Sequence, residues 1–402
     1  MLRAAARGAP ASSRSSPAES FPLSEHPLIY LPEGEEPRSA RWHAENGAAP
    51  PKRVVIADDT MTADSAWRLA AEGTGLLWRS DFQNARQMLQ ALMRRIDRPR
   101  KERRKAEAPD QAPGAAFHRH RQAQAQRAHT LSMLLIPFDG DYGIPLRRAP
   151  DVRLACSEAW GAPDGEASVA SLRELLGLIG AHEWRKKGVA VPALGAHIHP
   201  HYGVFAPIRS EYAGLVAGAP LPAQTLAFDI GTGTGVLAAV LARRGVAKVI
   251  ATETDARALA CARENITRLG LDAQVEIVET DMFPEGRAPL IVCNPPWIPS
   301  TPSAPIERAV YDAGGKMLRG YLQGLAAHLE PEGEGWLILS DIAEHLGLRT
   351  RDELLAMIDA GGLKVLARKD ARPQHPKTRD VADPLHAARA AEITSLWRLA
   401  LR

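Results

Sequence analysis

The 402-residue sequence has few cysteines, few aromatic residues and no long apolar run. Its three cysteines, Cys156, Cys261 and Cys293, are far apart in the sequence. They lack the paired spacing of zinc sites, and their small number favours a reducing compartment. No apolar run approaches the ~20 residues that a membrane span needs, and no secretory signal core follows Met1. The net charge of +3 identifies no partner by itself. We expect a cytoplasmic protein of two or three domains, without a membrane partner.

A glycine-rich turn between a predicted strand and a predicted helix is the most informative feature of the sequence. The run Phe228-Asp-Ile-Gly-Thr-Gly-Thr-Gly235 ends an apolar segment and is followed by apolar residues from Val236 onward. Glycines permit a tight turn and let backbone N–H groups approach a ligand closely. Such a turn can also bind nothing, but the strand–turn–helix context favours a nucleotide-like cofactor. A dinucleotide fingerprint needs a small residue at position 236, so Val236 argues against a dehydrogenase.

Acidic residues accompany three successive predicted strands. Asp229 lies in the first strand, Glu253 ends the second, and Asp281 follows the third. An acid about 20 residues past the glycines can bind both hydroxyls of a ribose. An acid at the position of Asp281 can accept a hydrogen bond from an adenine amino group. Each acid alone is more often a solvated loop residue, so the prediction depends on all three lying at one edge of a sheet.

A short proline-containing segment, Asn294-Pro-Pro-Trp297, follows a fourth predicted strand. Its two prolines fix the backbone and remove two N–H donors. The Asn294 side-chain oxygen and the Pro295 carbonyl can then both accept from one planar NH2 group, on which Trp297 can stack. These bonds increase the electron density of the nitrogen, which can attack an electrophilic carbon without a metal. The alternative is a proline turn with a packing tryptophan.

Together these residues resemble the class I S-adenosylmethionine-dependent methyltransferases, and within them the "methyltransferase small" domains that methylate planar nitrogens. The resemblance covers about residues 221–402. It implies an α/β fold with a Rossmann-like sheet of seven mostly parallel strands, preceded by a smaller α+β region. Most relatives have Tyr or Phe where this chain has Trp297, which changes the size of the target pocket.

The resemblance also implies roles for single residues. The expected cofactor-binding residues are Asp229, Gly231, Thr232, Gly233 and Gly235 near the methionine end, Glu253 at the ribose, Asp281 at the adenine, and Met282 and Asn294 as further contacts. The expected catalytic residues around the target nitrogen are Asn294, Pro295, Pro296 and Trp297. No metal is expected.

Composition divides the chain into four predicted regions. Residues 1–52 are rich in Ala, Ser, Pro, Gly and Arg and are predicted to be a disordered tail. The start of this tail also has the composition of a transit peptide, although the Ala/Arg bias of the whole chain favours a bacterial origin. Residues 53–130 are predicted to be helical and basic, and 131–220 an α+β substrate-recognition region with a hairpin. Residues 221–402 would form the methyltransferase domain.

Two polar clusters in the N-terminal half allow further interpretations. Eight of the twelve residues from Arg94 to Lys105 are basic, as in a phosphate-binding surface or in a solvated linker. His197, His199 and His201 would share one face of a hairpin strand. Because no Cys or acidic residue lies nearby in sequence and Pro200 interrupts the run, a metal site is disfavoured.

Three functions are therefore considered. The leading one is methyl transfer to N6 of adenine in ribosomal or transfer RNA, which the basic run favours. The close alternative is methylation of a glutamine side-chain amide in a translation protein, which the hairpin layout favours. The third is a non-catalytic RNA- or ribosome-binding protein that retains the fold, but the intact glycine turn and Asn294 argue against it.

Overall fold

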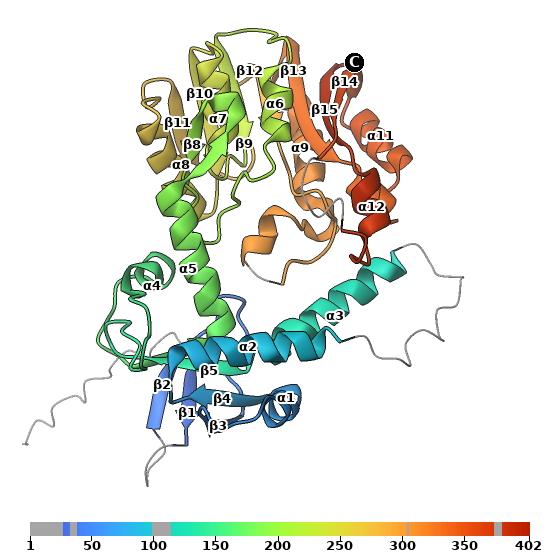
Figure 1. Cartoon of the computed structure of the whole chain (residues 1–402). Helices are drawn as coiled ribbons and strands as arrows, with labels where there is room; N and C mark the ends of the chain where they lie inside the picture. Colours follow the sequence, from blue (N-terminus) through green and yellow to red (C-terminus); the bar gives the residue numbers. More distant parts are fainter. Residues whose placement is uncertain (1–26, 33–37, 99–113, 304, 374–379) are drawn as a thin grey trace, which may run out of the picture.

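The computed structural model describes residues 27–32, 38–98, 114–303, 305–373 and 380–402. These residues form two domains, each built on its own β-sheet, and the long helix α5 (Leu172–Lys187) runs from the first domain to the second (Figure 1). Within the described residues, no helix has the length and apolar character required to cross a bilayer.

The N-terminal domain contains a six-stranded mixed sheet in the order β1-β2-β6-β5-β4-β3. Its strands are β1 (Leu28–Leu31), β2 (Arg38–His43), β3 (Arg53–Ala57), β4 (Thr74–Trp78), β5 (Leu134–Phe138) and β6 (Ser168–Ser171). Its helices are α1 (Ala63–Ala71), α2 (Phe82–Ile96), α3 (Ala115–Ser132), α4 (Arg153–Trp160) and α5. Strands β4 and β5 are buried along their whole length, as expected of central strands that are covered on both faces.

This domain differs from the regions predicted from composition. Strands β1 and β2 lie within the segment predicted to be disordered, and they bury Ile29, Leu31 and Trp42 against the sheet. The boundary predicted at residue 130 is also absent, because strands from both sides of it pair in one sheet. Strands β1 and β2 are only four and six residues long. Such short segments show too few alternations of buried and exposed residues for the sequence pattern to predict a strand.

The C-terminal domain contains a seven-stranded sheet in the order β11-β10-β9-β12-β13-β15-β14. Its strands are β9 (Leu226–Ile230), β10 (Lys248–Glu253), β11 (Val275–Glu279), β12 (Ala288–Cys293), β13 (Leu329–Ser340), β14 (Leu363–Ala371) and β15 (Thr394–Leu401). Only β15 runs antiparallel to its neighbours. The predicted seven-stranded, mostly parallel sheet is confirmed.

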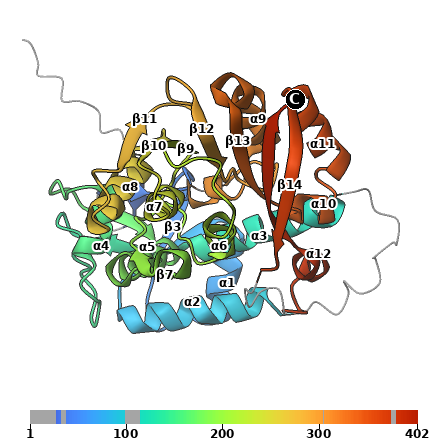
Figure 2. The same ribbon diagram turned by 90° about the horizontal axis from the view of Figure 1, so that it is seen from above.

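Helices cover both faces of this sheet (Figure 2). The helices of this domain are α6 (Glu211–Ala217), α7 (Val236–Arg243), α8 (Ala256–Arg268), α9 (Lys316–His328), α10 (Ile342–His345), α11 (Arg351–Ala360) and α12 (His386–Ala391). Of these, α10 and α12 pack together with Phe117 of α3 in a separate apolar cluster. The core on one face includes α6 and α7, and the core on the other includes α9 and α11. The predicted hairpin is present as β7 (Val189–Val191) and β8 (Ala196–Ile198), and it packs on the α7 face.

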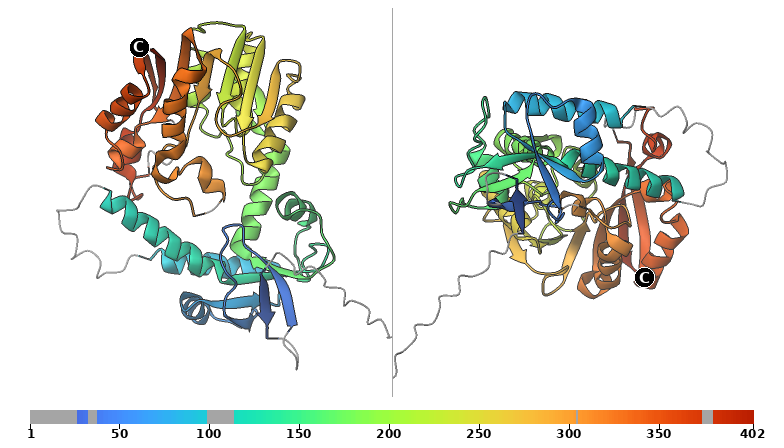
Figure 3. Two further views of the ribbon diagram at one scale, coloured as in Figure 1. Left: turned by 180° about the vertical axis from the view of Figure 1, so that it is seen from behind. Right: turned by 90° about the horizontal axis from the view of Figure 1, so that it is seen from below.

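The carboxyl-terminal edge of the parallel strands faces the N-terminal domain. Helix α3 runs beneath this edge (Figure 3), where Arg121 pairs with Glu307 in the loop after β12 at 3.1 Å. At the other side, Glu45 pairs with Arg257 of α8 at 2.7 Å. The N-terminal domain thus contacts the loops on both sides of the edge where a parallel sheet of this kind binds ligands.

Candidate active site

The glycine turn joins β9 to α7, as predicted. Gly231, Gly233 and Gly235 all have positive φ angles, of 67°, 57° and 81°. These angles lie in the left-handed region, which favours glycine. No atom lies within 4 Å of the place that a Cβ of Gly233 would occupy, so the turn is open to a ligand there. The turn therefore forms a cradle with room for the predicted cofactor.

Asp229 fixes the shape of this turn from behind. Its side chain is buried, and its Oδ2 accepts hydrogen bonds from Thr232 Oγ1 at 2.6 Å and from the Ala238 backbone N–H at 3.0 Å. The second bond satisfies a donor in the first turn of α7, which has no side-chain cap of its own. Burial raises the pKa of Asp229 to about 6. Asp229 and Thr232 thus hold the turn together.

Glu253 lies beside the turn, at the end of β10. Its carboxylate accepts from the backbone N–H groups of Gly233 at 3.0 Å, Thr254 at 2.9 Å and Asp255 at 3.2 Å. A carboxylate offers about four acceptor positions, and three of these are already occupied by the N–H groups. Binding two ribose hydroxyls would therefore require Glu253 to release one N–H, that of Gly233. Because that group lies in the open turn, Glu253 fits the predicted ribose position.

The turn after β11 carries the predicted adenine-binding residues. Asp281 is exposed, and Met282 has a positive φ of 60°. The Met282 carbonyl accepts from Thr252 Oγ1 at 2.7 Å, and the Thr280 N–H donates to the Glu253 carbonyl at 3.2 Å. These bonds hold Asp281 next to the end of β10. The structure thus brings the predicted cofactor-binding residues to one edge of the sheet.

Asn294, Pro295, Pro296 and Trp297 follow β12 at the same edge. Cys293 pairs with Ile230 of β9, so Asn294 and Gly231 leave adjacent strands at the same level. The Asn294 Oδ1 already accepts a hydrogen bond from Trp297 Nε1 at 2.9 Å. The sequence predicted that this oxygen accepts from a target NH2 group, and it gave no indication of the bond from Trp297. The second lone pair of this oxygen remains available to a target NH2 group.

Arg209 is a further residue of the site, to which the sequence assigned no role. Its Cζ lies 5.4 Å from the centre of the Trp297 ring. Its Nε donates to Glu211 at 3.1 Å, and its Nη2 donates to the buried Glu392 at 2.9 Å. A planar target must therefore use the other face of Trp297 or displace this guanidinium. The one sequence signal was the position of Arg209 shortly before the glycine turn.

Two of the three histidines singled out in the sequence, His199 and His201, have partners within the protein, whereas His197 is exposed on β8. His199 Nδ1 lies 2.6 Å from the Arg185 carbonyl, and His201 Nε2 lies 2.7 Å from Glu264. Among the residues that the structure describes, no group of three or more His, Cys, Asp or Glu side chains could hold a metal ion.

The basic run from Arg94 to Lys105 is described only in part. Arg95 pairs with Asp64. Residues 99–113, which contain most of the run, lie outside the described residues. On the neighbouring helix α3, Arg127 pairs with Asp97 at 2.8 Å.

Part of the chain is similar to known methyltransferases. Residues 196–345 match the model of the methyltransferase small domain. The chain is 34% identical over 170 residues to the release factor glutamine methyltransferase of Cereibacter sphaeroides. The aligned region covers 39% of this chain and 58% of that protein. It is 32% identical over 166 residues to the tRNA1(Val) (adenine(37)-N6)-methyltransferase of Bacteroides fragilis, and this aligned region covers 37% of this chain and 70% of that protein.

A solved structure gives a more distant match. A S-adenosylmethionine-dependent methyltransferase from Geobacter sulfurreducens, in complex with S-adenosyl-L-homocysteine, aligns with a TM-score of 0.35 and 17% identity, covering 52% of this chain and 96% of that one. The relative from Bacteroides, which is 32% identical and is covered over 70% of its length, assigns the family. The chain belongs to the methyltransferase small domain family, and its residues fit the S-adenosylmethionine cofactor predicted from the sequence.

Proposed function

We propose that this protein transfers the methyl group of S-adenosylmethionine to a planar NH2 nitrogen of a macromolecule. The supporting observation is the strand pairing of Cys293 with Ile230. Because of this register, the loop predicted to hold the target starts beside the loop predicted to hold the cofactor. Methyl transfer between two bound groups needs this adjacency, since positioning supplies much of the catalytic effect.

The residues of the chain act by orientation. When bound, the cofactor supplies an electrophilic methyl group. The free lone pair of Asn294 Oδ1 and the Pro295 carbonyl accept from the two hydrogens of the target NH2 and fix its plane. The N–H of Trp297 keeps the Asn294 amide in the orientation in which that lone pair faces the target. These acceptors favour the positive charge that develops on the nitrogen during attack.

The target that the described residues favour is a side-chain amide of a polypeptide. Arginines near the site are engaged by carboxylates: Arg121 by Glu307 and Arg209 by Glu392. Paired guanidinium groups contribute less to binding phosphates than free ones do. The relative from Cereibacter is named for glutamine methylation.

Adenine N6 in RNA is the second candidate target. The basic residues between Arg94 and Lys105 favour it, as does the name of the relative from Bacteroides. The buried, unpaired cysteines Cys156, Cys261 and Cys293 are consistent with activity in the cytoplasm.

The test is transfer of label from tritiated S-adenosylmethionine into a lysate of a strain that lacks the protein. The variants are Asn294→Ala and, as a matched control, Asn84→Ala on helix α2. Cofactor affinity is measured separately by calorimetry. We expect Asn294→Ala to lose the label even when S-adenosylmethionine is raised to saturate the variant, because Asn294 is expected to contact both the cofactor and the target, while Asn84→Ala keeps the label and the cofactor affinity. Equal labelling by Asn294→Ala would refute the proposal, and cofactor binding without any labelling by the wild type would favour a non-catalytic binding protein.

A further inference from the structure

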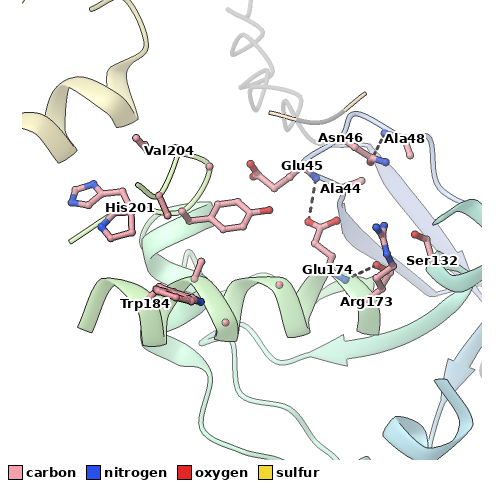
Figure 4. A pocket seen from close by; sticks show the side chains of 18 of the residues that line it. Ala44, Glu45, Asn46, Ala48, Ser132, Arg173, Glu174, Trp184, His201 and Val204 are labelled. Carbon is pink, nitrogen blue, oxygen red and sulfur yellow. Dashed lines mark hydrogen bonds between the residues drawn. The ribbon is translucent and has the colours of Figure 1, made fainter. Parts of the chain in front are cut away.

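A cavity of about 520 Å³ lies between the N-terminal domain and the segment that precedes the glycine turn (Figure 4). One face of helix α5 forms its floor, from Arg173 to Trp184. One wall is the loop 44–48 after β2, and the other is the segment 200–208 after the hairpin. The cavity is therefore built by both domains. Most of its lining lies outside residues 196–345, over which the chain matches its family.

The floor of the cavity lacks side chains at two glycines, and large apolar side chains lie at its margins. Gly177 and Gly180 line it, and apart from the adjoining residues and backbone of α5 itself, no atom lies within 4 Å of the place that a Cβ would occupy at either. The large apolar side chains of Trp184 and Ile208 line the same cavity and remain 45% and 52% exposed. Exposed groups of this size in a concave site are typical of binding surfaces.

The charged groups in the lining are mainly carboxylates. The Glu174 carboxylate accepts from the Glu45 backbone N–H at 3.1 Å, and Figure 4 shows the Glu174 side chain pointing toward the backbone of Glu45. Burial raises the pKa of Glu174 to about 7, and the neighbouring Arg173 offsets only part of this rise. Arg173 is the single Arg or Lys among the residues that line the cavity. Arg257, next to the cavity, is paired with Glu45. Glu174 is therefore the carboxylate of the lining that a basic group of a ligand can approach, and Arg173 is the one guanidinium of the lining that could bind a phosphate.

The cavity is continuous with the target site along the chain. Ile208 in its wall directly precedes Arg209, whose guanidinium lies over Trp297. The wall of the cavity and the residue over Trp297 are thus neighbours in the chain, which places the cavity beside the proposed target site.

We propose that this cavity binds a loop of a polypeptide substrate that flanks the methylated side-chain amide. An apolar side chain of the loop packs on Trp184 and Ile208, and a basic side chain binds at Glu174. This inference rests on the proposed methyl transfer and names the substrate class of that activity. The N-terminal domain thereby selects the substrate, whereas the C-terminal domain performs the transfer.

The test uses variants that fill the cavity and leave the residues proposed to bind the cofactor or the target nitrogen unchanged. Gly180→Leu places a side chain in the open floor, and leucine also favours a helix more than glycine does, which preserves folding. Gly177→Met is a second variant of the same kind. Glu183→Leu is the matched control, because it lies on the same helix and does not line the cavity. Labelling is measured as above, with the product divided by RNase and by protease and the folding checked by circular dichroism.

We expect protease-sensitive label to fall about tenfold or more in both glycine variants, with unchanged cofactor affinity, and to stay at the wild-type level in Glu183→Leu. Glu174→Gln should lower the label several-fold without blocking the cavity. Full labelling by Gly180→Leu and Gly177→Met, or label that is sensitive only to RNase, would overturn the inference while leaving methyl transfer intact. Absence of any label with the wild-type protein would instead refute the methyl transfer on which the inference rests.

Discussion

Replacing Trp297 with phenylalanine isolates the hydrogen bond that orients Asn294. The change keeps an aromatic ring under Arg209 and removes the indole N–H that donates to Asn294 Oδ1 at 2.9 Å. A neutral hydrogen bond contributes about 1 kcal/mol, so losing it frees the amide to rotate and lowers the rate about fivefold. The smaller ring also leaves space near the target, so the loss should be at least of this size.

The assay measures methyl transfer at saturating S-adenosylmethionine together with the dissociation constant of the cofactor. We expect a lower turnover number with little change in cofactor affinity, because Trp297 is not among the residues that form the cofactor turn. Trp67→Phe on helix α1 is the matched control and should behave like the wild type. A Trp297→Phe enzyme with wild-type turnover would refute the idea that this N–H orients the catalytic amide.

Three further predictions concern the residues around the site. Arg209→Met leaves the buried Glu392 without its cationic partner and should lower the free energy of unfolding by about 2 kcal/mol, measured by urea denaturation, whereas Arg209→Lys should lose less. Burial raises the pKa of Asp229 from 3.8 to about 6, so the folded state binds the proton more tightly than the unfolded state. Stability of the cofactor-free protein should therefore fall as the pH rises from about 4 to 6, by at most about 3 kcal/mol, and Asp229→Asn should lack this fall in urea titrations. Glu253→Gln should weaken cofactor binding about tenfold or more in calorimetry, because hydrogen bonds to a charged acceptor are the stronger ones, and unchanged affinity would exclude Glu253 from the ribose site.

The C-terminal sheet, and the position of the candidate site residues at one edge of it, could be predicted because their signals are local. A buried parallel strand is an uninterrupted apolar run, and the glycine turn and Asn294–Trp297 each follow such a run directly. Parallel strands bring their carboxyl ends to the same edge of the sheet, whatever sequence connects one strand to the next. This is why Asp229, Glu253 and Asp281 could be placed together before their contacts were known.

The remaining features depend on contacts between distant residues. Arg209 meets Glu392, which lies 183 residues further along the chain, and no local pattern encodes that pair. The bond from Trp297 to Asn294 depends on side-chain conformations that the motif alone does not specify. The first two strands became recognisable only through their partners in the N-terminal sheet, and the cavity above α5 needs both domains to form.

The chemical position of the transferred methyl group tests the central claim most directly. Product labelled with tritiated S-adenosylmethionine is separated into RNA and protein, and the protein is hydrolysed in acid. A methylated side-chain amide releases its nitrogen with the label as methylamine, and we predict that the wild-type product does so while Asn294→Ala gives none. Label recovered as N6-methyladenine would retain the planar-nitrogen chemistry and assign the target to RNA. Label recovered as methanol, or retained on carbon, would contradict methyl transfer to a planar nitrogen.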